Sequence, residues 1–437
     1  MKQKISWQRW LGAAVATSLL ATACGSDAGG EAASDEPETV AEEAAPEEDE
    51  TEGEDAGEEA ASACTEPIKI GMLNPTSGVY ASIAEEIERG FELYVSENGG
   101  ELGGRAVDLI VEDTEANPEV AVRAANKLIN QDQVEFATGV ISSAVALAVA
   151  DAFSEAEIPV VISNAVGTVL TGPDRSDYIF RVSLSGWQGS YPGAQWIRDN
   201  WTEEAVFTSA PDYAAGRDFA SSFEAGIEDA GGAIAGAQFP PFAQTQDYQP
   251  YLSEIRNSGA EAVYAFYAGA EAVNFVNQYA QFGLAGEVPL LGAISLVSDD
   301  VLPAQGDAAE GIHILSPWSV ALDNETNQNF LSAYEAAHGE SRMGYAAPFA
   351  YDAAQLIDVA LQATNGCTDD PQALISAMEG AELDSPRGPL TIDPETHGTV
   401  QTMYVMEVQE QDGELVHVPV ADLGVWGEQP GSGPQGD

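Results

Sequence analysis

The stretch Ile68–Gly100, IKIGMLNPTSGVYASIAEEIERGFELYVSENGG, indicates the fold class of this 437-residue chain. Its first six residues, IKIGML, form a short apolar run typical of a buried strand. After a turn of small residues, large apolar side chains recur at helical spacing and share one face: Ile83, Ile87, Phe91, Tyr94 and Val95. The stretch therefore predicts a strand followed by an amphipathic helix, the unit from which parallel sheets with covering helices are built.

The same alternation of strand and helix continues along the chain. A first series includes VDLIVEDT (107–114), PEVAVRAANKLINQ (118–131), VEFATGV (134–140) and PVVIS (159–163), and a second series runs from about residue 186 to VPLLGA (288–293). Nine or ten such units are more than one open sheet usually contains, so we expect two α/β lobes. An eight-fold barrel is the competing architecture. The strand-like runs TMYVMEVQE (402–410) and ELVHVPV (414–420) argue against it, because a barrel would end in a helix.

The N-terminus has the features of an export signal. MKQKISWQRW carries Lys2, Lys4 and Arg9, and the apolar run that follows is too short to span a membrane. The sequence LATAC resembles a bacterial lipobox, which predicts a signal peptide over 1–23 and lipidation of Cys24; an ordinary secretory signal with an incidental cysteine is the alternative. Residues 24–66 contain no lysine or arginine and many carboxylates, so we expect a disordered acidic tether.

The charge and the cysteines limit the partners and the compartment. The chain has 15 Lys and Arg against 72 Asp and Glu, and its formal net charge of −57 excludes nucleic acid and anionic lipid surfaces as usual partners. If Cys24 is lipidated, Cys64 and Cys367 remain as an even pair. Export places them in an oxidising compartment, so we predict a disulfide between them.

Catalytic and metal-binding motifs are absent from the sequence. It has no nucleophile elbow, no phosphate loop, no dinucleotide fingerprint and no paired metal-ligand histidines, so we expect neither an enzyme nor a metal or cofactor site. Small and hydroxyl residues instead follow several predicted strands, as in GVISSAVA (139–146) and SNAVGTVLTG (163–172). The carboxyl ends of parallel strands are where open α/β sheets bind ligands. Ser143 and the nearby amides can receive a carboxylate, although Ser142 and Ser143 can also be simple helix N-caps.

The order and spacing of these segments resemble a known family. Across residues 67–425 the chain is similar to the branched-chain amino-acid-type solute-binding proteins of ABC importers. The segments that carry the similarity are the stretch quoted above, GGRAVDLIVEDTEANPEVAVRAANKLINQ, IPVVISNAVGTVLTG, DYAAGRDFA, QYAQFGL and PFAYDAAQLIDVAL. The resemblance implies a type I periplasmic-binding fold, with two Rossmann-like lobes joined by three crossovers. Lobe 1 would comprise 67–184 plus 318–386 and lobe 2 would comprise 185–317 plus 387–427, followed by a disordered tail over 428–437.

The resemblance also implies a ligand site. We transfer the family's ligand positions to this chain and add neighbours that could complete the pocket wall. The resulting residues are Tyr80, Ser142, Ser143, Asn164, Ala165, Val166, Trp187, Tyr213, Ala268 and Ile294, with Phe266 or Tyr267 as a further aromatic wall. Ser143 corresponds to the serine that binds the ligand's carboxylate. Val166 stands where the family has a threonine, Ala268 where it has a second tyrosine, and Ile294 where it has the acid that binds the ligand's amino group. Because an unpaired buried ammonium is costly, these departures favour a carboxylate with an aromatic or apolar body, such as a benzoate, over leucine, isoleucine or valine.

The function implied is capture of a small solute without catalysis. We expect a monomeric lipoprotein on the outer face of a bacterial cytoplasmic membrane, which closes on its ligand and delivers it to an ABC permease and its ATPase. A ligand-sensing receptor that acts on a signalling partner has the same fold and is the alternative. An exported hydrolase is a third class, which the lack of a nucleophile–base pair disfavours.

Overall fold

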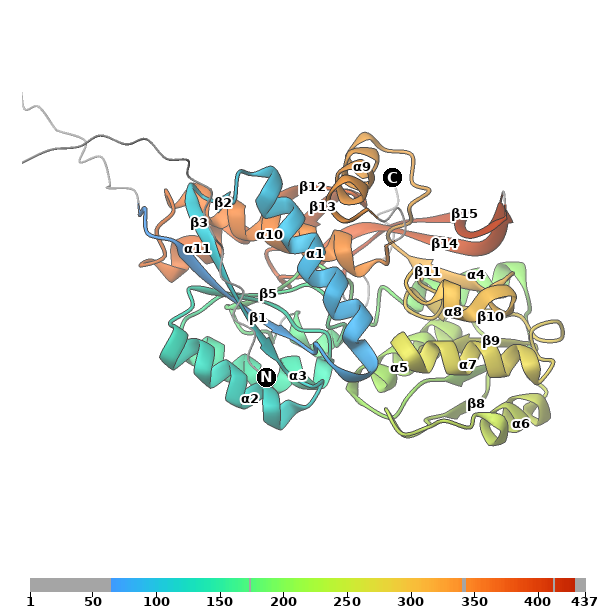
Figure 1. Ribbon diagram of the computed structural model, residues 1–437. Helices are drawn as coiled ribbons and strands as arrows, with labels where there is room; N and C mark the ends of the chain where they lie inside the picture. The colour runs from blue at the N-terminus through green and yellow to red at the C-terminus, as the bar shows by residue number, and fades with distance from the viewer. Residues whose placement is uncertain (1–63, 173, 340–342, 412, 429–437) are drawn as a thin grey trace, which may run out of the picture. The chain divides into compact units, whose positions relative to one another are not determined.

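The computed structural model describes residues 64–172, 174–339, 343–411 and 413–428 (Figure 1). The predicted signal peptide, Cys24 and nearly all of the tether lie outside these residues. No helix in the described ranges is long and apolar enough to cross a membrane.

The first sheet has six strands in the order β2-β3-β1-β4-β5-β6. Their bounds are β1 Ile68–Asn74, β2 Glu101–Leu102, β3 Arg105–Asp113, β4 Phe136–Gly139, β5 Val160–Ile162 and β6 Ile179–Arg181. All neighbours pair in parallel except β2 with β3. The strands β1, β4, β5 and β6 are almost entirely buried, which is why they read as continuous apolar runs.

Helices cover both faces of this sheet (Figure 1). Those of the first half are η1 Gly78–Tyr80, α1 Ala81–Glu97, α2 Pro118–Lys127, η2 Leu128–Asp132, α3 Ser143–Glu155 and η3 Thr168–Leu170. Later in the chain α9 Glu325–His338, α10 Ala346–Ala363 and α11 Pro371–Met378 follow. Alternate residues of β1 face opposite sides: Ile70 and Met72 belong to the same core as α1 and α10, whereas Leu73 packs with α2 and α3.

The second sheet has nine strands in the order β12-β13-β14-β11-β10-β9-β7-β8, with β15 also paired to β14. Their bounds are β7 Val206–Ser209, β8 Ile234–Gln238, β9 Ala262–Ala265, β10 Leu290–Ala293, β11 His313–Ser316, β12 Glu382–Ser385, β13 Gly388–Ile392, β14 Thr399–Gln411 and β15 Glu414–Trp426. Strands β7 to β11 are parallel, and β14 adds to β11 in the antiparallel sense. The predicted C-terminal strands are therefore present as one long hairpin.

The helices of this half are α4 Tyr191–Asn200, α5 Ala214–Asp229, α6 Gln249–Ser258, α7 Gly269–Gln281, α8 Leu302–Gln305 and η4 Gly306–Ala309. The two mostly parallel sheets and their helices form the predicted two-lobe α/β fold, not a barrel. The exact lobe boundaries stay a prediction, and the boundary placed at 386 falls within the β12–β13 hairpin.

Two features join segments that are distant in the sequence. A disulfide links Cys64 to Cys367, whose Cα atoms lie 5.1 Å apart. At the other end, the side chain of Glu428 is fully buried and pairs with Arg181 at 2.7 Å. Glu428, the first residue of the predicted tail, is thus the partner that the buried Arg181 requires, and residues 429–437 lie outside the described residues.

Candidate functional site

A cavity lies among the loops that follow the parallel strands of both sheets. Its volume is about 20 Å³, room for about one water molecule, so a larger ligand requires the surrounding side chains or loops to move apart. The lining residues are Tyr80, Ile83, Ile141, Asn164, Val166, Leu184, Tyr213, Phe219, Phe266, Ala268, Ile294, Ser295, Tyr345 and Phe349. Both sheets therefore contribute to one enclosed space at their carboxyl edges, where the sequence placed the site.

Direct contacts between the two sets of loops enclose this cavity. The hydroxyl of Tyr80, from η1, lies 2.9 Å from the hydroxyl of Tyr213, which precedes α5. Thr168 donates to the Asp218 carboxylate through its backbone N–H at 2.9 Å and its Oγ1 at 2.8 Å. Ser82 Oγ donates to Asp300 Oδ2 at 3.2 Å.

The polar groups on the cavity wall are neutral. None of the lining residues that the structure describes is a lysine, an arginine or a carboxylate. Burial raises the pKa of Tyr80, Tyr213 and Tyr345, so all three phenols remain protonated at neutral pH. Tyr213 is half-buried, and its hydroxyl lies 2.9 Å from that of Tyr80. The wall thus offers hydrogen-bond donors without a fixed charge.

Two buried polar atoms near the cavity have no hydrogen-bond partner among the described residues. They are Nδ2 of Asn164, a lining residue, and Oγ of Ser142, the N-cap of α3. Unpaired buried polar groups are uncommon and often mark a place where a ligand or water completes the bonding. Both atoms lie at the start of α3 or in the loop beside it, where a helix N-terminus favours an anion.

Buried carboxylates surround the cavity but do not line it. Glu271 is 4% exposed, and burial raises its pKa to about 7 despite a hydrogen bond from the Ala243 N–H. Burial also raises the pKa of Glu86 and of Asp300. No cluster of acid, histidine or cysteine residues in the described part could hold a metal ion.

The structure brings six of the ten predicted ligand residues to the cavity. These are Tyr80, Asn164, Val166, Tyr213, Ala268 and Ile294. Ser142, Ser143, Ala165 and Trp187 are buried without lining it.

Two of those four residues make contacts that explain their position. Ser143 Oγ accepts the N–H of Gly167 at 3.0 Å and so fixes the loop that carries Asn164 and Val166. The Trp187 ring stacks on Tyr191 with ring centroids 3.7 Å apart. Ser143 is therefore a support of the cavity wall in this structure, and Trp187 packs away from it.

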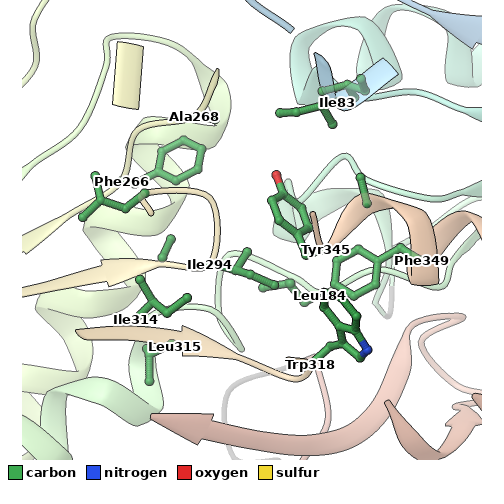
Figure 2. Packing of buried hydrophobic residues seen from close by; sticks show 14 of the residues in the cluster. Ile83, Leu184, Phe266, Ala268, Ile294, Ile314, Leu315, Trp318, Tyr345 and Phe349 are labelled. Atoms are coloured by element: carbon green, nitrogen blue, oxygen red, sulfur yellow. The ribbon is translucent and has the colours of Figure 1, made fainter. Parts of the chain in front are cut away.

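Sequence reasoning missed the contribution of the segment before and within α10. Tyr345 and Phe349 line the cavity although they lie more than 250 residues after Tyr80. Figure 2 shows the Tyr345 hydroxyl directed into the space beside Ile83, with Phe349 next to it. The aromatic pair in GYAAPF, at the start of a buried helix, was the available signal.

Comparison with known proteins places the chain in a family. Residues 67–414 match the model of the periplasmic binding protein family. The chain is 30% identical to "Leu/Ile/Val-binding protein homolog 6" of Brucella melitensis over 81% of this chain and 90% of the relative.

Solved structures agree with this assignment. A solute-binding protein of an ABC transporter from R. palustris, in complex with 4-hydroxybenzoate, has a TM-score of 0.77 at 30% identity, covering 82% of this chain and 96% of the other. A second one, from Rhodopseudomonas palustris BisB5 in complex with 3,4-dihydroxy benzoic acid, has a TM-score of 0.77 at 32% identity, covering 82% and 97%. The chain therefore belongs to the periplasmic binding protein family and is a substrate-binding protein of the ABC-transporter type.

Proposed function

We propose that this protein captures an aromatic carboxylate, such as benzoate or a hydroxybenzoate, between its two lobes and delivers it to an ABC permease. The observation that carries the proposal is the cavity wall: aromatic rings from the loops of both sheets surround neutral hydrogen-bond donors, and no carboxylate of the described residues lines the cavity. Structural neighbours at 30 to 32% identity include proteins solved with benzoate, 4-hydroxybenzoate and 3,4-dihydroxybenzoic acid.

The carboxylate has a suitable place at the start of α3. Asn164 Nδ2 and Ser142 Oγ are buried donors without partners, and the first amides of α3 add a favourable partial charge. The aromatic body would then lie against the rings of Phe266 and Phe349. A phenolic hydroxyl on the ligand would find Tyr80 and Tyr213 as partners on the enclosing side.

An amino-acid ligand fits this wall less well. Its ammonium group needs a buried anion, and position 294, where the family's acid is expected, carries Ile294 at 4% exposure. Glu271, Glu86 and Asp300 do not line the cavity, so none of them is placed to pair with a ligand's ammonium there. Relatives named as Leu/Ile/Val-binding proteins nevertheless make leucine the necessary comparison ligand.

We further propose that the chain is exported and anchored to the outer face of the cytoplasmic membrane through Cys24, and that it works as a monomer. The basic and apolar N-terminus, the LATAC sequence and the acidic segment after it support this arrangement. Labelling of Cys24 with a radioactive or alkyne-bearing fatty acid during expression tests the anchor, and Cys24→Ala should abolish the label.

Thermal-shift screening of benzoates beside branched-chain amino acids tests the ligand class. A ligand present at about 100 times its Kd stabilises the folded state by roughly 2.7 kcal/mol, which gives a shift of several degrees. We expect the shift with benzoates, and stabilisation by leucine without any by benzoates would contradict the proposal. Tyr213→Ala should remove the shift, whereas Tyr251→Ala, a half-buried tyrosine of α6 outside the cavity, should retain it.

A further inference from the structure

The loop between β8 and α6 covers one side of the Tyr80–Tyr213 contact. Its Phe242 ring stacks on Tyr213 with centroids 4.3 Å apart and planes 20° from parallel. The same ring lies 5.9 Å from Tyr80, which follows β1 of the other sheet. Phe242 is half-buried and does not line the cavity. It therefore lies behind the tyrosines that enclose the cavity and contacts rings from both sets of loops.

Two side chains of α7 fasten this loop to the second sheet. Glu271 Oε1 accepts the backbone N–H of Ala243 at 2.9 Å. About two turns further along α7, Gln278 Nε2 donates to the Gln246 carbonyl at 2.9 Å, and its Oε1 accepts the Tyr248 N–H at 2.7 Å. Residues 271 and 278 are seven apart and so share a helix face. The loop is thus bound in its middle and near its end by one face of α7.

The residue beside Phe242 has a backbone conformation that needs such support. Ala243 has φ 58°, in the left-handed region that a residue with a Cβ disfavours. Its side chain is exposed and supplies no packing of its own. A strained backbone persists only when surrounding contacts fix it, and the Glu271 carboxylate is the contact at this position.

Glu271 is buried close to the place where the first sheet's loops approach α7. It lies in the first turn of α7, next to Gly269, whose Cα faces the Val79 carbonyl of η1. The charge of Glu271 helps to raise the pKa of four nearby phenols, those of Tyr80, Tyr213, Tyr248 and Tyr267. The Glu271 carboxylate, which binds the Phe242 loop, therefore lies close to the place where the two sets of loops meet.

We infer that the Phe242 loop is a cover that retains the bound ligand, that Phe242 is its retaining side chain, and that Glu271 is the residue that positions it. This inference rests on the proposed function, because it concerns how long the same cavity keeps its ligand. Release requires Tyr80 and Tyr213 to separate, and Phe242 stabilises their contact from outside. The loop acts on the rate of ligand release more than on the rate of entry.

The first test measures ligand release by stopped-flow displacement, with benzoate as the probe, or with leucine if leucine is the ligand that binds. Phe242→Ala should release the ligand about three to ten times faster, the range that loss of one aromatic pair gives, with the association rate nearly unchanged. Phe239→Ala is the matched control: Phe239 lies in the same loop and is half-buried, but it contacts the exposed Arg217 guanidinium. Equal release rates for the two variants would overturn the assignment of Phe242.

The second test needs no ligand and measures amide hydrogen exchange at Ala243. Glu271→Leu removes the acceptor and should speed exchange at this amide about tenfold or more, whereas Glu271→Gln keeps an acceptor oxygen and should preserve its protection. A merely structural role would give both variants the same exchange. Unchanged exchange in Glu271→Leu overturns the positioning role. Failure of the wild type to bind benzoates, with exchange as expected, counts against the proposed ligand and not against the loop.

Discussion

Gly269→Ala tests whether the two sets of loops must meet for the ligand to bind. Gly269 begins α7 on the second sheet, and a Cβ added there would lie 2.2 Å from the Val79 carbonyl oxygen of η1, which follows β1 on the first sheet. That distance is about 1 Å shorter than an ordinary contact. An added methyl group therefore blocks the observed approach unless the backbone of one loop moves.

The size of the effect follows from two separate costs. Placing a Cβ at φ +54° costs about 1 kcal/mol in the folded protein whether or not ligand is bound. The clash with Val79 arises only when the loops meet, and overpacking of this kind costs about 1–3 kcal/mol. Since about 1.4 kcal/mol corresponds to a factor of ten, ligand affinity should fall by about 5- to 150-fold.

Calorimetric titration of Gly269→Ala beside Gly259→Ala separates the two costs. Gly259 also has a positive φ, +73°, at the end of α6, but nothing lies within 4 Å of the position of its Cβ. Both variants should lose similar thermal stability, and only Gly269→Ala should lose affinity. Equal affinity in the two variants would refute the conclusion that binding requires the observed contact between the loops.

Three further predictions address the cavity, the covalent link and the buried acid. Ile294→Asp should weaken benzoate binding about 100-fold in calorimetry, because it places a negative charge in the neutral wall of a cavity that binds an anion, whereas Ile294→Asn should weaken it far less; equal losses would contradict this reading. The double variant Cys64→Ser with Cys367→Ser should lose about 2–5 kcal/mol of unfolding free energy, since the disulfide closes a 303-residue separation, and should keep its affinity because neither cysteine lines the cavity. Burial raises the Glu271 pKa from 4.5 to about 7, so the folded state binds this proton more tightly than the unfolded state does. The resulting stability is fully present below pH 4.5, and about 3 kcal/mol of it is lost as the pH rises to 7 and above. Denaturant titrations across this pH range should find the loss in the wild type and should not find this contribution in Glu271→Gln.

The fold was predictable because local sequence carries it. Continuous apolar runs such as IKIGML mark strands that are buried on both faces, and the helical spacing after them marks the covering layers. The end of the fold was less predictable, because a polar residue such as Glu428 is buried only through a partner far away in the sequence, Arg181.

The site was predictable to the extent that it uses strand ends. Tyr80, Asn164 and Tyr213 all lie in the segments that follow parallel strands, and all line the cavity. Tyr345 and Phe349 reach it from a helix whose position depends on packing against α1, a tertiary relation that periodicity does not encode. Side chains that support the wall from behind could not be separated from lining residues by sequence position alone.

Competition between benzoate and leucine for the purified protein tests the central claim most directly. The wild type is titrated calorimetrically with each ligand alone and with one ligand in the presence of the other. The neutral aromatic wall and the isoleucine at position 294, where an acid would be needed for an ammonium group, predict tighter binding of benzoate. We expect at least a tenfold difference in Kd in its favour. Tighter binding of leucine, undisturbed by excess benzoate, would contradict the account.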